Sequence, residues 1–135
     1  MIVTSSLLCL ALNIYHEARG EPLAGQLAIA EVTLNRVASS KFPDNVCDVV
    51  KQAKYYQGKP IRNKCQFSWY CDGKPDTPLN SAAWEKALLV ANAAYKQRSF
   101  RFTKGALYYH STKVKPFWSK SFNKTIQINN HIFYN

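Results

Sequence analysis

Apolar residues near the N-terminus recur every three or four positions, which is the spacing of a helix with one buried face. Leu8, Leu12 and Tyr15 follow this spacing and predict a helix that begins at residue 5 or 6 and ends at residue 19. Gly20 comes directly afterwards and is a natural stop for that helix. The first element of the chain is therefore expected to be an amphipathic helix.

The same spacing predicts a second helix over residues 23–38, joined to the first by a short connection. Its main apolar face consists of Leu27, Ala30, Leu34 and Val37. A short helix is expected near residues 46–51, after a loop. Because the connection between the first two helices is so short, they should be neighbours in space.

A third amphipathic helix is expected in the second half of the chain. Its apolar face consists of Trp84, Ala87, Leu88, Ala91 and Tyr95. Asn80 or Ser81 can cap its N-terminus, and Lys96 and Arg98 suit its C-terminal end.

The remaining segments lack a helical period. Residues 53–79 are rich in Tyr, Gly, Pro, Asn and Asp and are expected to be irregular, with a functional rather than a packing role. The stretches "ALYYH", "TIQI" and "HIFY" read as short strands. We therefore expect an α+β fold, mainly α with a small β region, and a single domain over residues 1–135.

Charge adds information about partners. Lys and Arg number 18 against 8 acidic residues, which gives a net charge of +10. Such a surface favours an anionic partner, either nucleic acid or the acidic polymers and lipids of a bacterial envelope, although it is also compatible with solubility alone. The basic residues are densest over 51–64, 96–104 and 113–124.

The apolar run from Leu7 to Leu12 is too short to span a membrane and has no basic segment before it. No classical export signal is therefore expected. The spacing of Cys65 and Cys71 does not match a zinc site, so no metal is expected. One disulfide among Cys47, Cys65 and Cys71 is expected if the protein works outside the cytoplasm, with Cys9 a buried free thiol.

Three glutamates are candidates for chemistry. Glycosidic cleavage needs a carboxylic acid that keeps its proton near neutral pH. Glu17, at the end of the first helix, has partly apolar neighbours in Tyr15 and His16, which would raise its pKa. A charge on Arg19 would oppose this if it pointed toward Glu17. Glu21 is expected to be structural, at the positive end of the second helix. Glu31 is either a second acid, an exposed residue or an ion-pair partner near Arg36.

Aromatic residues are numerous for so short a chain, and their rings suit the apolar faces of sugars. The set includes Trp69, Tyr70, Tyr108, Tyr109, Trp118, Phe133 and Tyr134. The same rings could be core residues, or could stack on the bases of single-stranded nucleic acid.

Four blocks of the chain resemble the spore-cortex-lytic, SleB-type family of cell-wall hydrolases. They are "IYHEARGEPLAGQLAIAEVTLNRV", "CQFSWYCDG", "GALYYH" and "HIFY", and together they extend from about Leu8 to Tyr134. The resemblance implies a lysozyme-like fold and cleavage of peptidoglycan between N-acetylmuramic acid and N-acetylglucosamine. It implies a lytic transglycosylase that needs no metal or other cofactor and leaves 1,6-anhydromuramic ends.

The resemblance also implies roles for individual residues. Glu17 stands at the position of the family's general acid and base. The candidate substrate-binding residues are Gln66, Phe67, Ser68, Trp69, Tyr108, Tyr109 and His110. Glu31 stands where the family commonly has small residues, which weakens it as a shared catalytic group.

Three alternatives remain open at this stage. The enzyme could be a muramidase that uses water, with a base such as Glu31, or the chain could be a non-catalytic glycan-binding or nucleic-acid-binding module. We expect a monomer that binds peptidoglycan and anionic envelope polymers or lipids, with no nucleic-acid partner. We also expect it to be made in the cytoplasm and to reach the wall by another route, such as host-cell lysis by a phage, or as part of a larger secreted protein.

Overall fold

Helices make up the body of the computed structural model, which describes residues 3–96 and 101–135. They are α1 (Ser5–Ala18), α2 (Leu23–Ala38), α3 (Val46–Val50) and α4 (Ser81–Lys96). Each predicted helix is confirmed, with bounds that differ by about one residue. The Asn80 side chain accepts a hydrogen bond from the Ala83 amide at 2.9 Å, which confirms the predicted cap of α4. The prediction for Arg98 lies outside the described residues.

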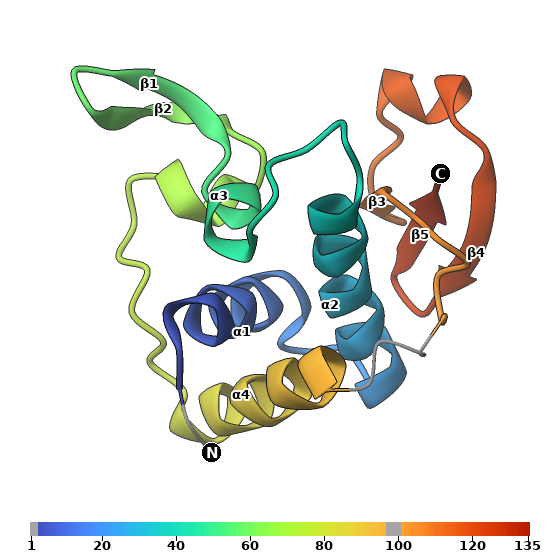
Figure 1. Cartoon of the computed structure of the whole chain (residues 1–135). Helices are drawn as coiled ribbons and strands as arrows, with labels where there is room; N and C mark the ends of the chain where they lie inside the picture. The colour runs from blue at the N-terminus through green and yellow to red at the C-terminus, as the bar shows by residue number, and fades with distance from the viewer. Residues whose placement is uncertain (1–2, 97–100) are drawn as a thin grey trace.

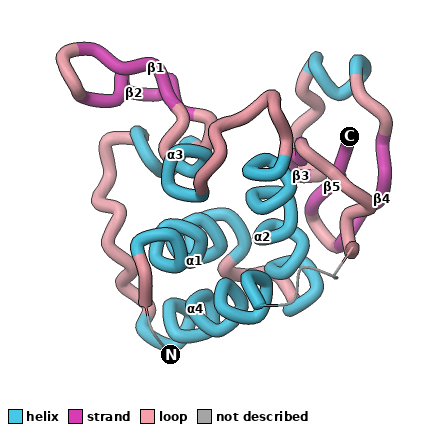
Figure 2. Tube along the Cα trace, in the orientation of Figure 1, coloured by secondary structure: helices cyan, strands magenta, loops and turns pink. Residues whose placement is uncertain are grey.

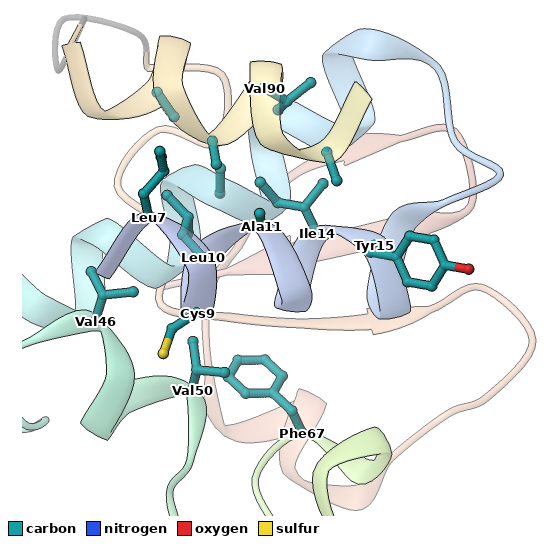
Figure 3. Close-up of a cluster of buried hydrophobic side chains, with 14 of the residues drawn as sticks. Leu7, Cys9, Leu10, Ala11, Ile14, Tyr15, Val46, Val50, Phe67 and Val90 are labelled. Carbon is teal, nitrogen blue, oxygen red and sulfur yellow. The ribbon is translucent and has the colours of Figure 1, made fainter. Parts of the chain in front are cut away.

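Helix α1 lies between α4 and α3 and forms the centre of a first hydrophobic core. Figure 3 shows Val90 of α4 on one side of α1 and Val46, Val50 and Phe67 on the other. The helix therefore buries a broad face, formed by Leu7, Leu10, Ala11 and Ile14. Leu8 is 40% exposed, so the predicted apolar stripe was wrong at that position. Residues 7–12 are nearly all apolar, so several faces of the helix could be buried. Packing against the neighbouring elements decides which face is buried.

Helix α2 contributes to two cores. The predicted face, with Ala30 at its centre, packs into the first core beside α1. Ala28, Ile29 and Val32 face a second core that also contains Ala106 and Phe133. Figures 1 and 2 show α2 between the other helices and the C-terminal sheet, so this helix joins the two halves of the fold.

The C-terminal sheet has three antiparallel strands in the order β3-β5-β4. They are β3 (Tyr108–Ser111), β4 (Lys124–Ile128) and β5 (His131–Tyr134), and the three short strands expected from the sequence are confirmed. A short 3-10 helix, η2 (Phe117–Ser121), connects β3 to β4. Tyr109 pairs with Phe133 in the register, which places Tyr109 beside the second core.

The segment expected to be irregular contains a β-hairpin that the sequence did not predict. Strand β1 (Ala53–Tyr56) pairs with β2 (Lys59–Cys65) through a tight turn. Gln57 and Gly58 both have positive φ, at 51° and 78°, as the mirror-image hairpin turns require. The strands show no alternation of apolar and polar residues, because nothing covers most of the hairpin; it projects from the body (Figure 1). A 3-10 helix, η1 (Ser68–Cys71), follows it.

Two disulfides connect these elements. Cys65 pairs with Cys71 at the base of the hairpin, within the set of three cysteines in which one bridge was expected. Cys9 pairs with Cys47, so the prediction of a free thiol at Cys9 was wrong. The packing of α3 against α1 brings these two cysteines together, and the local sequence contains no sign of that contact.

Two further observations concern the end of helix α1 and the hydropathy of the helices. Helix α1 ends where expected, but the backbone at Gly20 is not left-handed, so a glycine-specific cap is not the reason for the stop. No helix in the described part of the chain combines the length and hydropathy that crossing a bilayer requires.

The two disulfides should differ in their contribution to stability. Cys9 and Cys47 are separated by 38 residues and Cys65 and Cys71 by 6. Chain entropy then predicts a loss of about 4 kcal/mol for the double Ala variant at Cys9 and Cys47, and about 2 kcal/mol at Cys65 and Cys71. Urea unfolding of both variants measures the difference. A larger loss at Cys65 and Cys71 would contradict this ranking.

Candidate active site

Glu17 lies in the last turn of α1 and is half-buried. The hydroxyl of Tyr109, in β3, donates a hydrogen bond to its Oε1 atom. The Tyr109 ring packs near Phe67 and Phe133 and meets His131 edge-on at 5.4 Å. A carboxyl group at the end of α1 is thus held by a tyrosine of the C-terminal sheet.

The surroundings of Glu17 favour its protonated form. Burial raises its pKa above the ordinary value of 4.5, while the hydrogen bond from Tyr109 and the charges of His131, His16 and Arg36 oppose the rise. Burial also raises the pKa of Tyr109 well above its ordinary value, so the phenol remains a proton donor. The net effect is a carboxyl group that retains its proton to a higher pH than usual.

Arg19 does not oppose this effect directly. Its guanidinium hydrogen-bonds the hydroxyl of Tyr15 and lies over the Tyr15 ring, 4.6 Å from the centroid. The same hydroxyl accepts hydrogen bonds from the amides of Leu79 and Asn80. Arg19 is therefore engaged at the start of α4 and leaves the Glu17 carboxyl to Tyr109.

Two hollows adjoin the Glu17–Tyr109 pair, one lined by Glu17 and the other by Tyr109. The first has a volume of about 360 Å³, and Glu17, His16, Lys113 and His131 are among its lining residues. The second has a volume of about 290 Å³ and is lined by Arg36, Gln66, Tyr108, Tyr109, Trp118 and Phe122. Because Tyr109 lines the second hollow and binds a carboxylate that lines the first, the hydrogen bond connects them.

The structure brings together only some of the residues that the sequence suggested for substrate binding. Gln66, Tyr108 and Tyr109 line the second hollow. Phe67 and Trp69 are buried in the first core, where the Trp69 indole donates to Asn13 at 2.9 Å. Ser68 is exposed at the start of η1. His110 stacks on Tyr134 and contacts its hydroxyl at 2.8 Å, outside the residues that line either hollow.

Glu21 is structural, as expected, but through contacts that the sequence did not indicate. Its carboxylate accepts from the Asn129 side chain at 2.7 Å and from the Asn130 amide at 3.2 Å. His131 Nδ1 lies 3.0 Å from Oε1 of Glu21, the oxygen that also accepts from the Asn130 amide. Glu21 therefore ties the start of α2 to the turn between β4 and β5.

Glu31 is buried, so the expectation of an exposed residue or an Arg36 ion pair was wrong. Its carboxylate accepts hydrogen bonds from the amides of Phe102 and Thr103, at 2.9 and 2.7 Å, and from the Thr103 hydroxyl. Four residues later the Asn35 side chain donates to the Ala106 carbonyl at 2.9 Å, and Arg36 donates to the Leu107 carbonyl at 2.7 Å. Asn35 and Arg36 thus connect α2 by hydrogen bonds to the segment that precedes β3.

Sequence reasoning did not identify Arg36 and His131 as part of the site. Arg36 is a charged residue on a helix with two apolar faces. A charge on such a helix was the feature of the sequence that could have indicated a buried functional residue. His131 has no such signal, because its contact with Glu21 spans most of the chain. Over residues 3–96 and 101–135, no group of three or more His, Cys, Asp or Glu side chains is placed to hold a metal ion.

Comparison with known proteins identifies relatives for nearly the whole chain. The family model described as Cell Wall Hydrolase matches residues 20–134, a stretch that begins just after Glu17. A spore cortex-lytic enzyme of Bacillus subtilis is 35% identical over 127 residues, and one of Bacillus cereus is 33% identical over 123 residues. These alignments cover 92% and 89% of this chain. The chain spans only 35% and 40% of the length of those two relatives.

Two solved structures share the fold. The catalytic domain of the germination-specific lytic transglycosylase SleB from Bacillus anthracis superposes with a TM-score of 0.71 at 30% identity, covering 99% of this chain and 97% of that one. The catalytic domain of the Bacillus cereus SleB protein gives a TM-score of 0.66 at 29% identity, covering 99% and 93%. Both are catalytic domains, and their similarity bears out the predicted lysozyme-like, mainly α fold.

The raised pKa of Glu17 predicts a pH-dependent effect on stability. A buried carboxyl with a raised pKa favours the folded state at low pH, and this advantage is lost as pH rises from the ordinary value of 4.5 through the folded-state pKa. Glu17→Gln should therefore melt at a higher temperature than wild type at pH 7. Below the ordinary carboxyl pKa the difference should disappear, because both states of the wild type are then protonated. Melting curves from pH 3.5 to 8 measure this, and a variant less stable at pH 7 would contradict it.

Proposed function

The chain belongs to the cell wall hydrolase family that includes the SleB-type spore cortex-lytic enzymes, and we propose that it is a lytic transglycosylase acting on peptidoglycan. In this proposal it cleaves between N-acetylmuramic acid and N-acetylglucosamine. The observation that carries the proposal is the Glu17 carboxyl, whose pKa is raised by burial and whose Oε1 atom is bound by Tyr109 at the edge of the first hollow. A glycan strand that occupied both hollows would contact Glu17 in the first and Tyr109 in the second.

The proposed reaction needs one carboxyl group. Tyr109 binds Oε1 of Glu17, and within residues 3–96 and 101–135 no hydrogen bond engages the other carboxyl oxygen, which can therefore carry the acidic proton. Glu17 gives this proton to the glycosidic oxygen, and the bond to C1 of the muramic residue breaks as positive charge develops at C1. The C6 hydroxyl of the same sugar then attacks C1 and returns its proton to Glu17. The products are a 1,6-anhydromuramic end and a free hydroxyl on the departing sugar.

The positions of the other carboxylates favour this route over hydrolysis by water. An inverting muramidase would need a second carboxylate to activate water. Glu31 is committed to Phe102 and Thr103, and Glu21 to the turn between β4 and β5. Neither is free to act as that base, which supports the single-carboxyl mechanism.

Product analysis tests the reaction. Purified peptidoglycan digested with the wild type should yield new 1,6-anhydro ends by mass spectrometry, and Glu17→Gln should lower the rate by roughly 10²- to 10⁴-fold, the usual contribution of a general acid. Glu85→Gln is the matched control, because Glu85 is exposed on α4. Reducing ends would indicate a muramidase instead. Full activity of Glu17→Gln would remove Glu17 from the mechanism, and no new ends with wild type would leave only a binding module.

The two disulfides indicate the compartment in which the protein works. Disulfides persist in oxidising compartments, which supports action at the wall, outside the cytoplasm.

Helix α2 contributes to both cores, which supports the proposal that the chain forms a single catalytic domain.

We further propose that the β1–β2 hairpin contacts anionic polymers of the envelope. It projects from the body and carries Lys54, Lys59, Arg62 and Lys64 without an acidic residue. Tyr56, at its tip, is 68% exposed. Four of the 18 basic residues of the chain therefore lie on this hairpin, which gives it a local positive charge.

A pair of charge variants tests the role of the hairpin. Replacing Lys54, Lys59 and Lys64 with Gln lowers the net charge from +10 to +7, and so does replacing Lys41, Lys86 and Lys124 elsewhere on the surface. If the hairpin is the contact, only the first variant should lose several-fold in sedimentation binding to purified walls at low salt, with a weaker dependence on salt. Equal losses would show that net charge alone is responsible.

A further inference from the structure

Arg36 is a charged side chain buried without full compensation. It is 2% exposed, and its Nε atom donates to the Leu107 carbonyl at 2.7 Å. Its Nη1 atom is buried and has no hydrogen-bond partner among the described residues. Such a donor normally finds a partner, because leaving it unpaired costs free energy.

Aromatic rings fix the position of this guanidinium. Its Cζ atom lies 4.9 Å from the ring centroid of Phe42, 5.3 Å from that of Phe67 and 5.6 Å from that of Tyr108. These cation–π contacts hold the guanidinium among three aromatic rings, while its Nη1 atom remains without a hydrogen-bond partner among the described residues. The charge is therefore presented in a fixed orientation rather than on a mobile side chain.

The guanidinium lines the hollow of about 290 Å³, together with Gln66, Trp118 and three further aromatic residues. The Glu17 carboxyl is bound by Tyr109 and lines the other hollow, so it does not form an ion pair with Arg36. The hollow thus combines a buried cation that has unused donors, an amide at its rim and apolar ring faces. A carboxylate attached to a small apolar group matches this combination.

We propose that this hollow binds the lactyl carboxylate of a muramic residue, so that the enzyme prefers glycan strands from which the peptide stems have been removed. The inference rests on the proposed glycan-cleaving function and specifies its substrate. A free lactyl group carries a carboxylate that can pair with the Arg36 guanidinium, and its methyl group can lie against Trp118 or Tyr108. In a peptide-bearing strand the same carbonyl belongs to a neutral amide, and the buried charge stays uncompensated.

Binding to the wild-type protein is the first test, because it requires no variant. The ligands are N-acetylmuramic acid, its lactyl methyl ester and N-acetylglucosamine, and the reporter is the indole N–H of Trp118 in NMR titrations, assigned by Trp118→Phe. The acid should bind at least tenfold more tightly than the ester. Equal affinity for acid and ester, or a response confined to other tryptophans, would overturn the proposal.

Variants then assign the preference to Arg36. Arg36→Gln keeps a donor for the Leu107 carbonyl and should bind acid and ester equally; melting curves check that it folds. Gln66→Ala, at the exposed rim, should weaken both ligands by a similar factor and keep the preference. If Arg36→Gln does not fold, the affinities of the wild type for the acid and the ester still test whether the hollow binds a carboxylate. If it folds and retains the preference, Arg36 is not the anion-binding group.

A kinetic comparison separates this inference from the proposed function. The substrates are amidase-treated peptidoglycan and the same glycan with its lactyl carboxylates converted to methylamides. The value of kcat/KM should be about tenfold higher for the free carboxylate. Equal rates would overturn the preference and leave the transglycosylase reaction intact. Cleavage of neither would reject the proposed reaction, while the NMR titration would still report on the anion site.

Discussion

The hydrogen bond from Tyr109 to Glu17 is the interaction on which the rest of the site depends. It joins the end of α1, which belongs to the helical core, to β3, which belongs to the C-terminal sheet. Burial alone would raise the pKa of Glu17, but it would not hold the carboxyl in one orientation. The phenol does this with a proton that burial makes hard to lose. The result is a carboxyl group with one oxygen fixed and the other available.

The position of Tyr109 is set by helix α2. Glu31, Asn35 and Arg36 lie on one side of this helix and bind successive backbone groups between Phe102 and Leu107. The backbone leaves this row of contacts directly before Tyr108 and Tyr109. Glu21, at the other end of α2, holds the turn that precedes β5. Polar side chains on an otherwise apolar helix therefore place the strand that carries the tyrosine.

The charges of the chain have separate structural tasks. Glu21 and Glu31 accept hydrogen bonds from the C-terminal segment. Glu17 lines the same hollow as Glu21, but its carboxyl is bound by Tyr109 instead. Four exposed basic residues lie on the projecting hairpin, and a disulfide joins its last residue, Cys65, to Cys71 of η1. Arg36 differs from both sets, because it is a cation held inside the protein beside the acid.

The sequence by itself determined the helices, the C-terminal strands and the family, because each depends on local period or on ordered motifs such as "HEARGEP" and "GALYYH". Only the tertiary structure decided the partners of the buried polar groups. The bonds of Glu31 to Thr103 and of Glu21 to Asn130 join residues 72 and 109 positions apart, and the disulfide of Cys9 spans 38. No periodicity records such contacts, since they form only when two elements pack. The sequence did not predict the hairpin for the opposite reason. Most of its side chains are exposed, so its strands have no alternation of apolar and polar residues.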